Sequence, residues 1–139
     1  MDRKKEVMIM KKEIISTTKA PAPVGPYSNV VKYGNMLFIS GMASEDATTG
    51  EILHGTVAEQ TENIMKNIKA ILEDVGSSMG MVLKCSIHMT RAEYFSEMNQ
   101  VYASYFDKAD GYPARVTTFG SEMYDGLDVE IDVIAGIEE

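Results

Sequence analysis

Apolar side chains recur at intervals of three and four residues between Thr56 and Val75, as they do on one face of an α-helix. The segment starts with Thr56-Val57-Ala58-Glu59, a capping-box pattern in which the threonine and glutamate side chains each accept a backbone N–H. Gly76 fits the position after the helix end, where a left-handed backbone is common. We therefore predict a helix over Thr56–Val75. Its apolar face consists of Val57, Ile64, Ile68, Ile71, Leu72 and Val75.

A second helical stripe predicts a helix at about Ala92–Phe106, with Thr90-Arg91-Ala92-Glu93 as its cap. Tyr112-Pro113 ends the connection that follows, because the residue before a proline avoids the helical region. The stripe consists of Phe95, Met98, Tyr102, Tyr105 and Phe106.

Two longer segments alternate with a period of two, which is typical of strands with one buried face. In Asp128–Ile137, Val129 and Ile131 share one face and Glu130 lies on the other. Val82–Thr90 is predicted to place four apolar side chains on its buried face: Leu83, Cys85, Ile87 and Met89. Cys85 is therefore predicted to be a buried thiol.

Four shorter runs are also β-prone. Asn29–Lys32 and Met36–Ser40 flank Tyr33-Gly34-Asn35, which predicts a hairpin. Glu51–Leu53 follows a turn, and Arg115–Phe119 follows Pro113-Ala114. The element order is therefore β-β-β-α-β-α-β-β, which predicts an α+β fold with a mixed sheet and both helices on one face. Apolar residues on the other face would favour association with further copies.

The amino-acid composition and the net charge exclude some classes of function. The chain has 139 residues, 45% of them hydrophobic, which fits one domain with a single core. We assign 1–12 as a charged, flexible leader and 13–139 as the domain. The net charge of −8 opposes binding to a nucleic-acid backbone, so we expect no nucleic-acid partner. We also expect no membrane span, no secretory or mitochondrial signal and a cytoplasmic location.

Few residues suggest chemistry by themselves. No phosphate loop, Rossmann glycine pattern or nucleophile elbow is present. Arg115 at a strand start is usually solvent-facing, but its planar fork can also hold a carboxylate. Glu130 is either an exposed carboxylate or a functional one that could neighbour Arg115, and Tyr27 more often anchors a loop. The residues alone lead no further than a soluble α+β domain.

Several motifs occur together in the order and spacing of one family. They are "APAPVGPYSNVV", "NMLFISG", "TTGEI", "EQTENIMKNIKAILEDVGSS", "YPARVTTF" and "VEIDVIA". The chain resembles the RidA family, also called YjgF or L-PSP, over about Ile14 to Ala135. The resemblance implies the chorismate-mutase-like α+β fold and a homotrimer with active clefts between neighbouring subunits.

The resemblance also implies an activity. RidA-type members hydrolyse reactive enamines and imines, such as 2-aminoacrylate and 2-iminobutanoate, to 2-keto acids and ammonia, with no metal or organic cofactor. These substrates leak from pyridoxal-phosphate enzymes. By position, Arg115 would clamp the substrate carboxylate, Glu130 would activate water, and the backbone around Thr117 would contact the imine nitrogen. The pocket would be lined by Tyr27, Ser40 and Asn99.

Two departures from the family pattern bear on substrate range. Met42 stands where many relatives have glutamine, and Gly120–Gly126 lacks a common Leu-Pro pattern. Two alternatives to the deaminase remain at this point. One is an endoribonuclease or translation inhibitor, as the L-PSP label suggests. The other is a non-catalytic, chaperone-like trimer that binds small carboxylates through Arg115.

Overall fold

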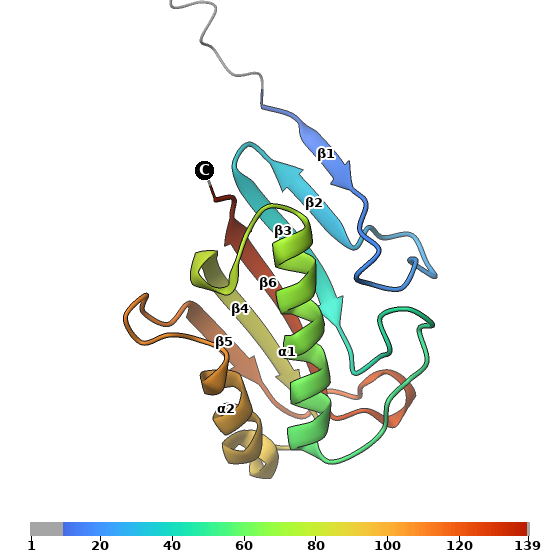
Figure 1. Ribbon diagram of the computed structural model, residues 1–139. Coiled ribbons are helices and arrows are strands. Elements are labelled where there is room, and N and C mark those ends of the chain that lie inside the picture. Colours follow the sequence, from blue (N-terminus) through green and yellow to red (C-terminus); the bar gives the residue numbers. More distant parts are fainter. Residues whose placement is uncertain (1–9, 139) are drawn as a thin grey trace, which may run out of the picture.

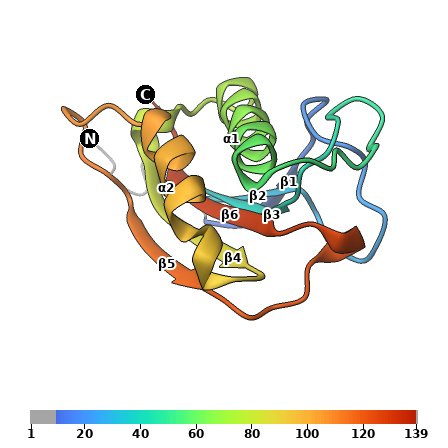
Figure 2. The ribbon, with the colours of Figure 1, turned by 90° about the horizontal axis from the view of Figure 1, so that it is seen from below.

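Six strands form one mixed sheet, and both helices pack on the same face of it (Figures 1 and 2). This arrangement comes from a computed structural model, which describes residues 10–138. It confirms the predicted α+β class. The strands are β1 Lys12–Ile15, β2 Val30–Tyr33, β3 Met36–Met42, β4 Val82–Met89, β5 Ala114–Thr118 and β6 Val129–Gly136, and the helices are α1 Val57–Asp74 and α2 Phe95–Ser104.

The strand order across the sheet is β1-β2-β3-β6-β4-β5. All neighbours are antiparallel except β4 and β5, which are parallel and connected through α2. The last strand, β6, therefore lies in the centre, between β3 and β4. This order places the β6 residues next to the loop that leaves β3 (Figure 1).

Helix α1 forms as the periodicity predicted. The Thr56 side chain accepts the Glu59 N–H and the Glu59 carboxylate accepts the Thr56 N–H, so the capping box is present. Its apolar side chains are fully buried against the sheet, which makes α1 the largest helical contribution to the core. Neither α1 nor any other helix in residues 10–138 is long and apolar enough to cross a bilayer.

The N-terminal half differs from prediction in two places. Glu51–Leu53 is not a strand of the sheet, since only an isolated bridge joins Ile52 to Glu45. The missed strand is β1, which pairs with β2 at the sheet edge. Its side chains are mostly exposed, so its sequence lacks a buried alternation. Most of the expected leader 1–12 lies outside the described residues, but Lys12 already belongs to β1.

The structure also differs from the prediction in β4 and at α2. A register shift in the pairing with β6 turns Leu83 outward and leaves it exposed, although the alternation placed it in the core. The predicted helix 92–106 is a short 3-10 turn at Ala92–Tyr94 followed by α2. Thr90 does not cap it, because the N-cap position is Arg91, and the Thr90 hydroxyl donates instead to the Asp128 carboxylate at 2.8 Å.

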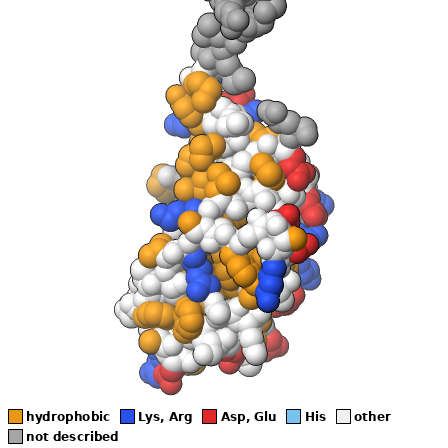
Figure 3. All heavy atoms as spheres, turned by 90° about the vertical axis from the view of Figure 1, so that its left-hand side faces the viewer, with side chains coloured by type: hydrophobic (Ala, Val, Ile, Leu, Met, Phe, Trp, Pro, Cys, Tyr) orange, Lys and Arg blue, Asp and Glu red, His pale blue; other side chains and the backbone are white. Residues whose placement is uncertain are grey.

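The sheet face opposite the helices carries an apolar row. Ile14, Val31, Phe38 and Ile134 pair with one another in turn across β1, β2, β3 and β6. Ile14 is 57% exposed and Phe38 41%. Seen from one side, hydrophobic side chains gather in patches on the surface, with Lys and Arg between them (Figure 3). An exposed row of this kind is typical of a surface that another protein chain covers.

Candidate active site in two halves

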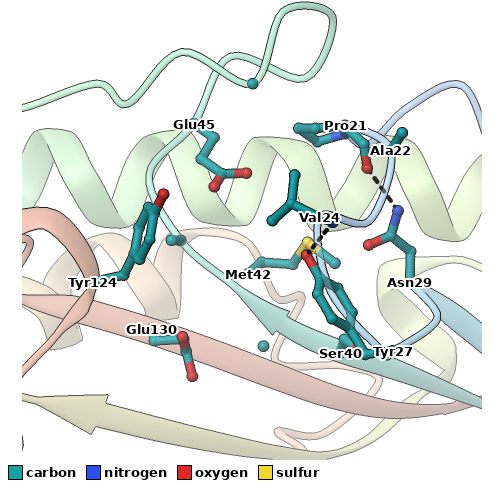
Figure 4. A pocket seen from close by; sticks show the side chains of 13 residues that line it. Pro21, Ala22, Val24, Tyr27, Asn29, Ser40, Met42, Glu45, Tyr124 and Glu130 are labelled. Atoms are coloured by element: carbon teal, nitrogen blue, oxygen red, sulfur yellow. Dashed lines mark hydrogen bonds between the residues drawn. The ribbon is translucent and has the colours of Figure 1, made fainter.

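A cavity of about 490 Å³ opens where the chain leaves β3 (Figure 4). Its walls come from the 21–29 loop, the end of β3, the 43–50 segment, the turn at Tyr124–Gly126 and β6. The cavity contains three of the predicted site residues, Tyr27, Ser40 and Glu130. It also contains Met42, the first of the two positions that depart from the family pattern.

Two hydrogen bonds from Ser40 to backbone carbonyls hold the 21–29 loop against β3. Its hydroxyl donates to the Ser28 carbonyl at 2.6 Å, and its N–H donates to the Asn29 carbonyl at 3.0 Å. The Asn29 amide in turn donates to the Pro21 carbonyl at 2.8 Å. These bonds set the position of Tyr27, whose ring stands half-exposed at the cavity wall (Figure 4). The Ser40 hydroxyl proton is therefore engaged within the protein.

Glu130 lies on the open face of the sheet, as its alternation predicted. A Cβ added to Gly41 would lie 2.6 Å from the Glu130 Oε2 atom, so the carboxylate packs directly on the Gly41 backbone.

A buried side-chain amide fixes the start of β6, the strand that carries Glu130. Gln60, only 2% exposed, donates to the Asp128 carboxylate at 3.1 Å and accepts the Asp128 N–H at 2.8 Å. Helix α1 therefore anchors the strand that presents Glu130.

Arg115 lies in a second cavity of about 380 Å³ beside α2. Its guanidinium carbon stands 5.4 Å from the Phe95 ring centroid and 5.0 Å from that of Tyr102, and one nitrogen donates to the Asn99 side-chain oxygen at 2.6 Å. Burial raises the pKa of Tyr102, so its ring stays neutral beside the cation. Two aromatic rings and one amide thus orient a guanidinium that lines the cavity and has five N–H donors in all.

Within one chain, Arg115 and Glu130 do not meet. Arg115 pairs in register with the buried Cys85, so it projects on the helix side of the sheet, whereas Glu130 pairs with His88 on the open side. The two positions are also about 10 Å apart along the strands and about 10 Å across them. The expectation that they neighbour each other is wrong for a single chain. The predicted residues divide into Arg115, Asn99 and Thr117 on one side and Tyr27, Ser40 and Glu130 on the other.

Two cavity residues had no clear signal in the sequence. Glu45 follows β3 in what was predicted to be the approach to a turn, and Tyr124 lies in the Gly120–Gly126 segment. Asp125 next to it has a left-handed φ of 51° and its carboxylate lies 3.5 Å from the His54 ring nitrogen Nε2. This contact ties the turn that carries Tyr124 to the segment before α1. Only the tertiary structure brings these residues to the cavity.

The fold and the two cavities define an α+β sheet protein whose candidate binding groups lie on both faces of the sheet. Comparison with known proteins matches the chain to one family. The model of the family described as Endoribonuclease L-PSP matches residues 17–137. A RutC family protein of Pyrococcus abyssi is 42% identical over 91% of this chain and 98% of its own.

Two further relatives have more specific names. "Reactive Intermediate Deaminase A, chloroplastic" of Arabidopsis thaliana is 36% identical over 91% of this chain and 66% of its own. The crystal structure of RidA from an Antarctic Psychrobacter superimposes with a TM-score of 0.82 at 38% identity, covering 90% of this chain and 99% of that one. The chain therefore belongs to the RidA family, also called YjgF or L-PSP, as its motifs indicated.

Proposed function

We propose that the protein hydrolyses reactive 2-imino acids and their enamine tautomers, such as 2-iminobutanoate and 2-aminoacrylate, to 2-keto acids and ammonia. The observation that carries the proposal is Arg115, whose guanidinium is held by Asn99 and two aromatic rings with donors left to bind a carboxylate. Membership of a family with a named reactive-intermediate deaminase supports it. We place the reaction in the cytoplasm, next to the pyridoxal-phosphate enzymes that release such intermediates.

The chemistry needs positioning and one base. The oxygen of a water molecule adds to the electrophilic imine carbon while Glu130 takes a proton from it, and the proton then goes to the nitrogen. The proton of the added hydroxyl group then moves to the nitrogen as the carbon–nitrogen bond breaks, so ammonia leaves and the remaining oxygen becomes the keto group. One imine and one water thus give one 2-keto acid and one ammonia. Arg115 holds the carboxylate, and the backbone around Thr117 contacts the nitrogen.

We propose further that the site is completed between copies of the chain in a homotrimer. The Arg115 half-site of one copy would face the Glu130 half-site of its neighbour. The separation of the two groups on opposite faces of one sheet supports this arrangement, and so does the exposed apolar row from Ile14 to Ile134. Tyr27 would then line the substrate, while Ser40 and Asn99 would orient the groups around it.

The two alternatives, an endoribonuclease and a non-catalytic carboxylate binder, have less support. The residues that line the Glu130 cavity include two glutamates and no lysine or arginine, and the whole chain carries a charge of −8. Both features oppose the binding of an RNA backbone. A non-catalytic carboxylate binder would need Arg115 but would give no role to Glu130 next to Gly41.

The direct test is the decay of 2-aminoacrylate generated in situ by a serine dehydratase, followed with and without the protein. We expect accelerated formation of pyruvate and ammonia. Decay at the buffer rate would overturn the proposal and leave the carboxylate binder, which calorimetry with a stable 2-keto acid would detect. RNA cleavage that persists through repurification would instead support the endoribonuclease.

Gly41→Ala tests the position of the Glu130 carboxylate. The new methyl group would lie 2.6 Å from Oε2, so it must displace the carboxylate from its place on the strand backbone. We expect kcat to fall about tenfold or more, as follows from misplacing a catalytic group by about 1 Å. The matched control is Gly25→Ala, whose methyl group would meet the Tyr27 ring at an ordinary 3.5 Å. Equal activity of the two variants would contradict the assigned position.

A further inference from the structure

The cavity that holds Glu130 contains a second carboxylate, that of Glu45. Glu45 comes from the segment after β3, and in Figure 4 its carboxylate is directed toward the interior between Tyr124, Val24 and Met42, with Glu130 below on β6. No lysine, arginine or histidine is among the residues that line this cavity. The half-site therefore presents two acidic groups and no counter-charge of its own.

The Glu45 carboxylate has no partner within the part of the chain that the structure describes. No hydrogen bond or ion pair reaches its oxygens from residues 10–138, and partial burial raises the pKa of the group. A partly desolvated carboxylate without a donor is less stable than one paired with a cation, because burial disfavours the charged form. A ligand that supplies a cation at this point would gain a charge-assisted hydrogen bond.

The backbone that carries Glu45 is held in place. Its carbonyl accepts the Asn67 side-chain N–H from α1 at 2.8 Å, and it pairs with Ile52 in an isolated bridge. The preceding residue, Ser44, is buried and accepts a hydrogen bond from the Asn63 amide at 3.0 Å. These contacts fix where the Glu45 side chain enters the cavity, so a bound cation would meet a positioned group.

Resting on the proposed deaminase function, we propose that Glu45 selects 2-imino acids whose side chain ends in an ammonium or guanidinium group. Water would be activated at Glu130, and the substrate side chain would extend along Met42 and Tyr124 to the Glu45 carboxylate. The thioether and the ring would cover its methylene groups, as apolar walls cover the stems of long cationic side chains. Short uncharged imines would not reach Glu45 and would gain nothing from it.

The test compares two imines that differ by one charge. An L-amino-acid oxidase with catalase converts L-arginine and L-citrulline into imino acids of equal length, one ending in guanidinium and the other in neutral urea. Semicarbazide captures the imine that the protein has not hydrolysed, so lost semicarbazone reports activity. We expect wild-type kcat/KM to be about tenfold higher for the arginine-derived imine, as one charge-assisted hydrogen bond provides.

The variant Glu45→Gln is expected to reduce this ratio to about one, because the amide keeps the shape and loses the charge. Glu51→Gln, an exposed glutamate six residues later that does not line the cavity, controls for the net charge and should keep the wild-type ratio. Circular dichroism and thermal unfolding verify that both variants are folded.

The outcomes separate the two proposals. If wild type hydrolyses both imines at similar kcat/KM, or if Glu45→Gln keeps the tenfold preference, the role of Glu45 is overturned while the deaminase function stands. If wild type hydrolyses neither of these imines nor 2-aminoacrylate, the deaminase function fails, and the selection by Glu45 fails with it.

Discussion

Arg115→Lys is expected to lower kcat/KM for 2-iminobutanoate by about 100-fold, which corresponds to the loss of one or two charge-assisted hydrogen bonds. Lysine keeps the positive charge but loses the planar fork that matches a carboxylate. It also loses the contacts that orient the guanidinium. These are the hydrogen bond to Asn99 and the stacking on the rings of Phe95 and Tyr102. Arg115→Ala should lose still more.

The prediction for Arg115→Lys also says which kinetic constant changes, KM or kcat. The substrate carboxylate is present in both the ground state and the transition state, so weakening its clamp should mainly raise KM. Arg91→Ala is the matched control, because Arg91 is exposed and forms an ion pair with Glu93, two residues later, at 2.7 Å. An Arg115→Lys protein with wild-type KM would show that the carboxylate binds elsewhere.

Glu130→Gln is expected to lower kcat by about 10²- to 10⁴-fold with little change in KM, which is the usual contribution of a positioned general base. Glutamine keeps the size and the contact with Gly41 but cannot take a proton from water. Asp132→Asn provides the comparison, since Asp132 lies two residues further on the same face of β6 and is outside the cavity lining. Equal losses in the two variants would indicate a general electrostatic effect and remove the base role from Glu130.

Mixing the two inactive variants tests where their groups meet. When Arg115→Ala and Glu130→Gln chains are unfolded together and refolded, some interfaces will combine an intact Arg115 from one chain with an intact Glu130 from the other. We expect activity to return to a fraction of the wild-type level. A chain with both substitutions, refolded in the same way with either single variant, regenerates no intact pair. No recovery in the first mixture would contradict a site that is shared between two copies.

Much of the fold could be predicted because its signals are local. The period of α1, its capping box and the alternation of β6 depend on near neighbours in sequence, and all three are confirmed. Strand β1 was missed because an exposed edge strand shows no buried alternation. The outward turn of Leu83 depends on a register shift against β6, which no pattern within β4 encodes.

The candidate site could be predicted only in part. The sequence indicated Arg115 and Glu130 as candidates, but their separation depends on β4 lying between β5 and β6 and on which face each strand presents. The strand order is a tertiary property. Glu45 was missed for a similar reason: its position in the cavity depends on Asn67, which holds the segment from a helix 22 residues away in sequence.

The placement of Arg115 and Glu130 on opposite faces of one sheet has a consequence for how activity scales with protein concentration. If a complete site needs groups from two copies, an isolated copy holds only half-sites and has no turnover. By mass action the fraction of working sites then rises more steeply than in proportion to the chain concentration near the dissociation constant of the assembly. Under the proposed function, a cell that makes little of the protein would have almost no deaminase activity, and an increase in expression near that dissociation constant would raise the activity more than in proportion.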